Sequence, residues 1–227
     1  MESTAPKKLL LGYWNCRGLG SVLHSLLHFC KVPYEDKVYV EREEWFEQTK
    51  PTIALDYPNL PYIIDGDKNI TETLAMMHYV VIKGNRRDLL GGSEEKHCKV
   101  LEVCSIVNDL RSHIIFLCWT RGDFEKERDE YFGNGRGKAF LAQFNKNLEG
   151  KEWIVDTLSI ADFWLLEHLD IVAGMNPAFL EPFPNLVGFR ERFVTLSEIQ
   201  EFRKTDKFIK QFFWSGAKPT WNNTQNQ

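Results

Sequence analysis

The hydrophobic pattern of this 227-residue chain changes near residue 90, and that change limits the possible folds more than any other feature. Before it, short apolar runs such as Leu9–Leu11 alternate with stretches whose apolar residues recur at helical spacing. From Ser93 to about Phe213 the spacing is helical throughout, and no stretch of any length has the alternation of a strand. The sequence therefore predicts an α/β domain followed by an all-helical domain.

The first part of the chain has the element order of a thioredoxin-like domain. We expect a strand at 9–13, a helix at 21–31, a strand at 36–40, a short helix at 43–48, strands at 62–64 and 69–70, and a helix at 71–83. Asp65-Gly66-Asp67 supplies the hairpin turn between the last two strands. A layer of this kind places its ligand near the strand ends.

The expected domain boundary is a polar, glycine-rich stretch between the two patterns. Ser93 is a good N-cap for the helix that follows, because its hydroxyl can accept from free backbone amides. Ser159 and Asp162 have the three-residue spacing of a reciprocal cap on a later helix. We expect a thioredoxin-like domain at 8–84, a linker at 85–92, an all-helical bundle at 93–214 and a polar C-terminal tail at 215–227.

Charge and cysteine content argue against several classes of partner. The chain has 28 Lys plus Arg against 32 Asp plus Glu and no long basic run, so we expect no nucleic-acid partner. We find neither a signal-peptide pattern nor a run of ~20 apolar residues, so we expect no membrane partner. Five cysteines without a C-x-x-C pair are typical of free thiols in a reducing compartment, which predicts a cytoplasmic protein.

Three positions in the first part could bind an anion or a thiol. Tyr13 ends the first strand just before a helix, whose free amides and positive dipole end favour a thiolate. Pro61 begins an apolar strand, where proline is tolerated at an edge or in a cis turn. Glu72 and Thr73 open another helix, a second place for an anion. Each signal taken alone is equally compatible with simple packing.

Together with further blocks, these positions resemble the mu class of cytosolic glutathione S-transferases. The resemblance spans about residues 8–221. Asp109-Leu110-Arg111, followed by Trp119, is more similar to the related pi class. The mu-like blocks are Gly-Tyr-Trp-x-x-Arg-Gly-Leu at 12–19, Asp-Tyr-Pro-Asn-Leu-Pro-Tyr at 56–62, Ile-Ile-Asp-Gly at 63–66, Ile-Thr-x-x-x-Ala at 70–75, Leu-Ser-Ile-Ala-Asp-Phe at 158–163 and Phe-Pro-Asn-Leu at 183–186.

The resemblance implies a dimeric enzyme that adds glutathione to electrophilic small molecules, a detoxification reaction. It implies the glutathione S-transferase fold, an α/β thioredoxin-like domain followed by an all-α helical bundle. Glutathione would be the co-substrate, without a metal, and the partners would be a hydrophobic electrophile and a second copy of the chain. The rival interpretation is a structural or scaffold subunit with this fold, little turnover and a place in a larger assembly.

The same resemblance assigns roles to individual residues. The phenol of Tyr13 would donate to the glutathione sulfur, and Trp14 and Leu19 would wall the site. Trp119 would line the electrophile pocket, and Tyr57 would anchor the dimer. The other glutathione contacts would be Arg42, Trp45 and Lys50 to the glycyl carboxylate, Asn59, Leu60 and Pro61 beside the cysteinyl unit, Glu72 and Thr73 to the γ-glutamyl group, and Asp109 of the partner subunit to its ammonium.

Two further features have alternative explanations. His24 and His28 are four residues apart in the first predicted helix and could bind a metal, although no carboxylate or third histidine is placed beside them. The alternative is a pair of surface histidines. Cys16 follows Tyr13 by three residues and could exchange thiols with glutathione, or it could fill a core position.

Overall fold

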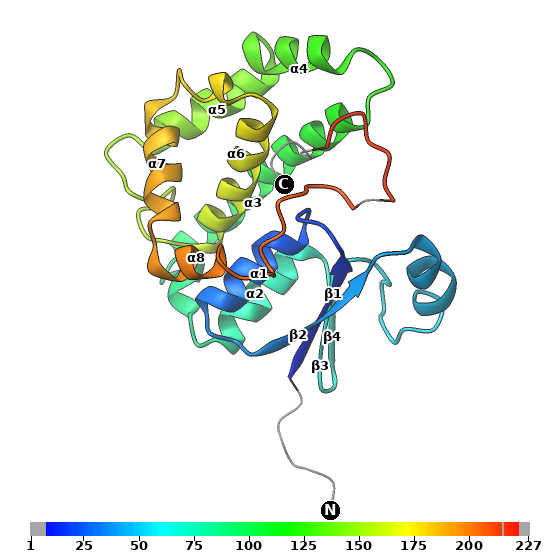
Figure 1. Ribbon diagram of the computed structural model, residues 1–227. Helices are drawn as coiled ribbons and strands as arrows, with labels where there is room; N and C mark the ends of the chain where they lie inside the picture. Colours follow the sequence, from blue (N-terminus) through cyan, green and yellow to red (C-terminus); the bar gives the residue numbers. More distant parts are fainter. Residues whose placement is uncertain (1–7, 215, 223–227) are drawn as a thin grey trace, which may run out of the picture.

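A four-stranded mixed sheet organises the first part of the chain. The computed structural model describes residues 8–214 and 216–222. The sheet has the strand order β2-β1-β3-β4, with β1 parallel to β2 and antiparallel to β3. Figure 1 shows α1 and α2 on one face of the sheet. The elements are β1 (Leu9–Trp14), α1 (Gly20–Phe29), β2 (Tyr34–Tyr39), a π-helix (Glu44–Thr49), β3 (Tyr62–Asp65), β4 (Lys68–Thr71) and α2 (Thr73–Lys83).

Each face of the sheet has its own apolar cluster, because successive side chains of a strand point to opposite faces. Leu9, Leu11 and Ile63 join the main core with the helices. The opposite face packs the half-buried Leu10 and Ile64 against a smaller cluster. That cluster consists of Tyr39, Trp45, Leu60 and Tyr62. The π-helix therefore covers this second face through the buried indole of Trp45.

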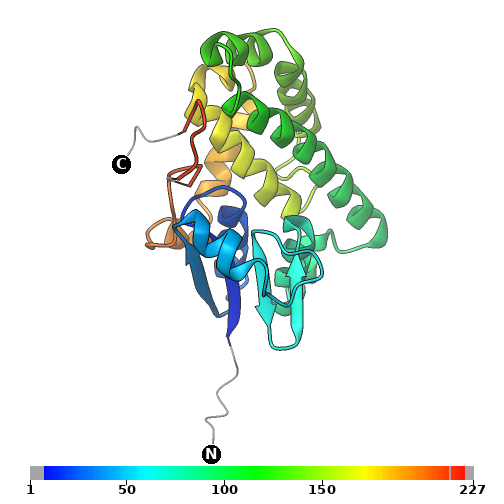
Figure 2. The same cartoon turned by 90° about the vertical axis from the view of Figure 1, so that its right-hand side faces the viewer.

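The second part of the chain is helical, as its apolar spacing predicts. The long α3 runs diagonally across it in Figure 2, and α6 is buried along nearly its whole length. Ser93 caps α3 by accepting from the Lys96 amide at 3.2 Å, as predicted. None of the helices in the described residues is long and apolar enough to cross a membrane. The helices are α3 (Glu94–Cys118), α4 (Phe124–Gly133), α5 (Arg136–Asn147), α6 (Ile160–Met175), α7 (Pro184–Val194) and α8 (Ser197–Phe202), with 3-10 turns at Arg87–Leu90 and Pro177–Phe179.

A buried ion cluster joins the two parts. The Nε and Nη2 atoms of Arg17, which follows β1, donate to the carboxylate of Glu167 on α6 at 2.8 and 3.0 Å. The Nη2 atom also donates to Asp170 at 2.8 Å. Arg190 and Arg203 contact the same Asp170 carboxylate. Burial lowers the pKa of Arg17, but the two carboxylates raise it by more, so the guanidinium stays charged.

The end of the chain returns to the α/β part (Figure 1, red). The amides of Arg17 and Gly18 donate to the carbonyls of Gln211 and Phe212 at 2.7 and 3.0 Å. The amide of Thr220 donates to the carbonyl of Cys118, the last residue of α3, at 2.8 Å. Residues 211–214 and 216–222 therefore lie between the β1–α1 loop and the end of α3, and 216–222 are the described part of the predicted tail.

The predicted capping box at the start of α6 is present and wholly buried. The Ser159 amide and hydroxyl both donate to the Asp162 carboxylate at 2.8 Å. The Ser159 hydroxyl oxygen accepts in return from the backbone amide of Asp162. The second carboxylate oxygen of Asp162 accepts from the Ile154 amide at 2.9 Å. The box therefore ties the preceding loop to the central helix.

We expect Ser159→Ala to lower the free energy of unfolding by about 1 kcal/mol, because it leaves a buried amide and carboxylate with fewer partners. Urea denaturation followed by circular dichroism measures this change. Ser112→Ala is the matched control, since the exposed Ser112 hydroxyl only donates to the Asn108 carbonyl on the surface of α3. Equal midpoints for the two variants would show that the cap contributes nothing.

Candidate functional site

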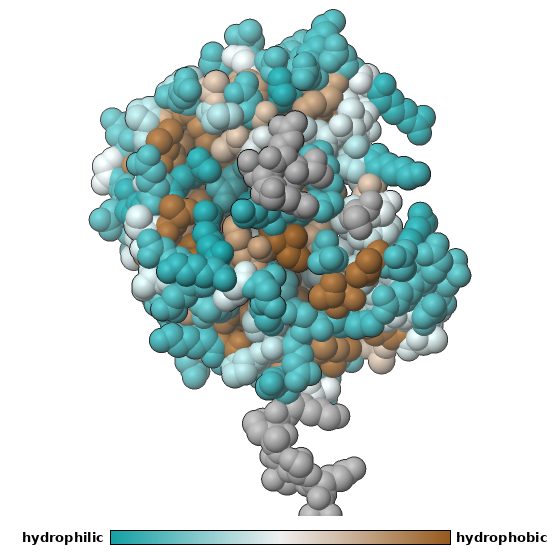
Figure 3. All heavy atoms as spheres, in the orientation of Figure 1, coloured by the Kyte–Doolittle hydropathy of each residue, from teal (hydrophilic) through white to brown (hydrophobic). Residues whose placement is uncertain are grey.

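A cavity of about 590 Å³ opens between the two parts of the molecule. Its wall is formed by the end of β1, the following loop, α3, α6 and residues 212–214 and 216–218, and most of its side chains are apolar or aromatic. In Figure 3, hydrophobic side chains interrupt the otherwise hydrophilic surface between the two parts. A cavity of this size and composition suits a small apolar ligand.

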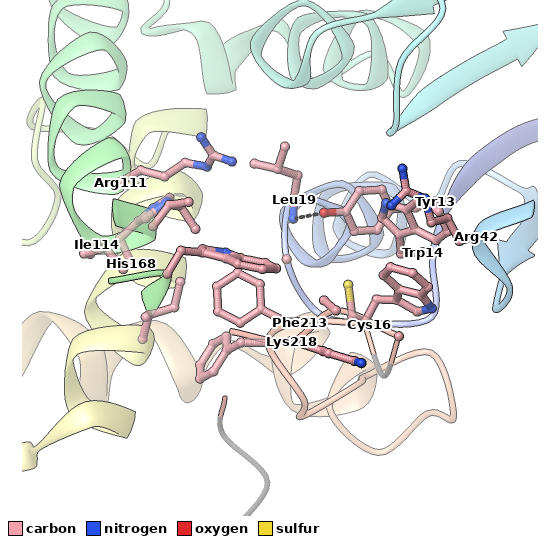
Figure 4. Close-up of a pocket in the computed structure, with 18 of the residues that line it drawn as sticks. Tyr13, Trp14, Cys16, Leu19, Arg42, Arg111, Ile114, His168, Phe213 and Lys218 are labelled. Carbon is pink, nitrogen blue, oxygen red and sulfur yellow. Dashed lines mark hydrogen bonds between the residues drawn. The ribbon is translucent and has the colours of Figure 1, made fainter. Parts of the chain in front are cut away.

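Tyr13 places its hydroxyl at the edge of this cavity. The oxygen accepts a hydrogen bond from the Leu19 amide at 2.9 Å, drawn as the dashed line in Figure 4. A Cβ atom at Gly18, whose φ is +31°, would lie 2.4 Å from that oxygen. Burial, reinforced by the nearby Cys16 thiol, raises the pKa of Tyr13 well above its ordinary value. The phenol therefore keeps its proton at neutral pH and can donate it to a ligand.

A second cavity of about 360 Å³ adjoins the first, since Leu19 and Arg111 line both. Glu72 and Thr73 form its floor at the amino terminus of α2. The backbone of Glu72 has a φ of +67°, a left-handed conformation that costs a non-glycine residue free energy and occurs often at functional sites. Asp109 of the same chain also lines this cavity. The cavity thus offers free amides beside two carboxylates.

The structure brings together some of the predicted site residues. Tyr13, Trp14, Leu19, Arg42 and Trp119 line the first cavity, and Leu19, Glu72 and Thr73 line the second. Asp109 of the same chain also lines the second cavity, whereas the prediction concerned the partner subunit's Asp109. Those that line neither cavity are Trp45, Lys50, Tyr57, Asn59, Leu60 and Pro61.

Several predicted residues that line neither cavity lie beside the π-helix or just before β3. Arg42 and Lys50 both stand over the ring of Phe46, at 4.7 and 5.7 Å from its centroid. The Leu60–Pro61 peptide bond is cis. Arg42 and Phe46 line the first cavity, so Lys50 lies next to its wall.

Residues that the sequence analysis did not assign also line the first cavity. Trp214 stacks on Trp14 with a centroid distance of 4.5 Å and an interplanar angle of 18°. His168 and Phe213 come from α6 and the C-terminal segment. Arg111 lies two residues beyond Asp109 on α3. The spacing of Arg111 from Ile114 and Ile115 on one predicted helix could have indicated that all three line the same cavity. No local pattern in the sequence indicates that Trp214 contacts Trp14.

The structure corrects the surface interpretation of His24. Its side chain is buried, its Nδ1 atom lies 2.9 Å from the Tyr34 hydroxyl, and Asp36 lies 3.5 Å away. Strand β2 runs beside α1, so it brings a carboxylate that is remote in sequence next to this histidine. Burial lowers the pKa of His24 to about 4. Among the described residues, we find no group of three or more His, Cys, Asp or Glu that could bind a metal.

Comparisons with known proteins agree on one family. The model for the N-terminal domain of glutathione S-transferases matches residues 10–81, and the model for the C-terminal domain matches residues 108–206. "Glutathione S-transferase Y1" of Cricetulus longicaudatus is 33% identical over 223 residues, covering 95% of this chain and 99% of that protein. "Glutathione S-transferase Mu 3" of Homo sapiens is 34% identical, covering 89% of this chain and 90% of that protein.

Solved structures agree with this result. The glutathione S-transferase Blo t 8 has a TM-score of 0.77 and 25% sequence identity, covering 87% of this chain and 93% of that chain. A rat hPGDS structure with a quinoline, at 21% identity and a TM-score of 0.75, shows the same fold over 86% of this chain and 96% of that chain.

The reactivity of Cys16 tests whether the first cavity stabilises a thiolate on the protein itself. Cys98 is exposed, whereas burial raises the pKa of Cys16 to about 12 and so disfavours the thiolate. We expect Ellman's reagent at pH 7.5 to modify native protein in one fast phase, which Cys98→Ser removes and Cys16→Ser preserves. A fast phase lost in Cys16→Ser would instead identify Cys16 as a reactive thiol.

Proposed function

The chain belongs to the glutathione S-transferase family, with mu-class relatives, and from this premise we propose that Tyr13 donates a hydrogen bond to the sulfur of bound glutathione. As a member of the family, the chain is an enzyme that conjugates glutathione to electrophilic compounds. The observation that carries the proposal is the Tyr13 hydroxyl at the cavity edge, which accepts from the Leu19 amide and keeps its own proton for a ligand.

The donated hydrogen bond supports the thiolate, the form of glutathione that attacks. A free thiol has a pKa of ~8.5 and is mostly protonated at neutral pH. Lowering that pKa by two units requires about 2.7 kcal/mol of preferential thiolate stabilisation. A phenol hydrogen bond together with the amides at the start of α1 is of the right size to supply it. The mechanism uses no metal.

We propose one site for each of the three parts of glutathione, in or beside the two cavities. The γ-glutamyl carboxylate binds at the Thr73 amide and hydroxyl, and Glu72 faces its ammonium. Arg42 and Lys50, with Trp45 behind them, bind the glycyl carboxylate at the other end. The cysteinyl unit pairs with the backbone of Leu60 next to the cis proline, beside Asn59.

The electrophile binds in the apolar part of the first cavity. Trp14, Trp119 and Phe213 provide its aromatic wall, and the C-terminal segment closes one side. When an aryl halide reacts, the sulfur forms a bond to the ring carbon and the halide leaves with the bonding pair. We also propose that the enzyme is cytoplasmic, because its five cysteines are free thiols, which suit a reducing compartment.

We expect Tyr13→Phe to lower kcat with an aryl halide about 100-fold while the Kd of glutathione changes less than about threefold, since only the thiolate contact is lost. The apparent pKa of bound glutathione, read from the pH dependence of kcat/KM, should rise. Tyr131→Phe is the matched control, because the buried Tyr131 hydroxyl has no hydrogen-bond partner in the described structure. An unchanged pH profile in Tyr13→Phe would refute the assignment.

The active form that we propose is a homodimer with Tyr57 as its anchor. The Tyr57 side chain is 77% exposed, so its ring can pack into a pocket of a partner. It lies in the turn before the cis proline, so a partner that holds it also supports the cysteinyl site. The proposal includes Asp109 of the partner subunit at the γ-glutamyl ammonium, in addition to the Asp109 that lines the cavity of its own chain.

We expect Tyr57→Ala to weaken dimerisation by at least about 2 kcal/mol at each of two symmetric contacts. Sedimentation at low micromolar concentration should then shift toward the 26.5 kDa monomer, with a parallel loss of activity. Phe116→Ala is the control, because the Phe116 ring on α3 is similarly exposed at 74%. A fully active dimeric Tyr57→Ala protein would remove Tyr57 from the interface.

A further inference from the structure

The mostly apolar wall of the first cavity also contains three positively charged side chains. Arg42, Arg111 and Lys218 line it, and its described lining includes no aspartate or glutamate. Figure 4 shows the three cations at separate sides of the space. His168 adds no charge at neutral pH, because burial lowers its pKa to about 3. The cavity is therefore cationic as well as hydrophobic.

Arg111 is the least satisfied of the three. Its side chain is half-buried on the inner face of α3, and burial lowers its pKa. Among the described residues, it forms neither a salt bridge nor a side-chain hydrogen bond. Arg17 shows the usual condition of a buried guanidinium here, with Glu167 and Asp170 within 3.0 Å. A desolvated cation without such partners favours a ligand that brings an anion.

The proposed glutathione contacts do not use Arg111, so its guanidinium can bind another anion. Its glycyl carboxylate takes Arg42 and Lys50, and its γ-glutamyl carboxylate takes the amide and hydroxyl of Thr73. The acids of the second cavity, Glu72 and Asp109, would face the glutathione ammonium in this arrangement, and neither forms a salt bridge with Arg111 among the described residues. What remains facing the electrophile space is Arg111, with the exposed Lys218 on the C-terminal segment.

We propose that the enzyme's preferred electrophiles are apolar molecules that carry a carboxylate, and that Arg111 binds this carboxylate as the residue that determines specificity. This inference rests on the proposed function. A planar guanidinium pairs with a carboxylate through two parallel hydrogen bonds, so it orients the ligand as well as attracting it. The aromatic wall formed by Trp14, Trp119 and Phe213 then holds the apolar body near the sulfur.

An unsaturated ketone gives a balanced reaction for the test. The glutathione sulfur forms a bond to the β-carbon of the enone, the π pair of the C=C bond moves toward the carbonyl, and water returns a proton to the α-carbon. No group leaves. The matched substrates are 4-phenylbut-3-en-2-one with either a carboxylate or a methyl ester at the para position of the ring, which differ in charge and little in shape.

We expect Arg111→Met to lower kcat/KM for the carboxylate substrate about 10-fold, the size of one charge-assisted contact. For the ester it should change less than about twofold, so the ester also reports that the variant is folded. Arg111→Lys should retain part of the carboxylate preference. Arg136→Met, which removes an exposed arginine on α5, should leave both values unchanged.

Two measurements separate failure of this inference from failure of the proposed function. An equal loss on both substrates in Arg111→Met, or a tenfold weaker glutathione Kd by calorimetry with an unchanged substrate ratio, would overturn the carboxylate contact. Binding of the saturated, unreactive carboxylate, followed by the fluorescence of Trp14, Trp119 and Trp214, tests the contact without turnover. Arg111-dependent binding in a protein that converts neither substrate would support the contact and refute conjugation.

Discussion

The buried contact of Arg17 with Glu167 and Asp170 is the constraint on which the site depends. It fixes the loop between β1 and α1 against α6, so an element of the α/β part cannot move without breaking an ion cluster in the helical part. Removing one partner of such a cluster leaves an uncompensated buried charge, whose free-energy cost greatly exceeds that of an exposed ion pair. The rings of Phe208 and Phe212 lie 5.6 and 4.9 Å from the guanidinium and exclude water from it.

The chemistry of the site follows from that fixed loop. The same residues that anchor to α6 also present the Leu19 amide to Tyr13 and the Arg17 and Gly18 amides to the C-terminal segment. The segment can therefore close the cavity only where the loop is already in place, and Trp214 then stacks on Trp14. The β1–α1 loop thus fixes the Tyr13 hydroxyl, part of the cavity wall and the position of the C-terminal segment.

Much of the fold could be predicted from sequence because the signals are local. Strands, helices and the Ser159 capping box depend on periodicity and short spacings, and they lie within a few residues of their predicted places. The contacts that the sequence missed join remote positions. Trp214 and Trp14 are separated by most of the chain, and the burial of His24 depends on Tyr34 in a neighbouring strand. Such contacts follow from tertiary packing, which no local pattern records.

Arg17 and Arg111 differ in role because they differ in their positions in the fold. Both Arg17 and Arg111 lie within blocks that resemble the family, but Arg17 is buried whereas Arg111 is half-buried. Two carboxylates raise the pKa of Arg17 and balance its charge within the fold. Burial lowers the pKa of Arg111, which faces an open cavity without a carboxylate in its described lining. The arginine side chain therefore stabilises the fold at position 17, whereas at position 111 it is a charge that a substrate carboxylate would neutralise.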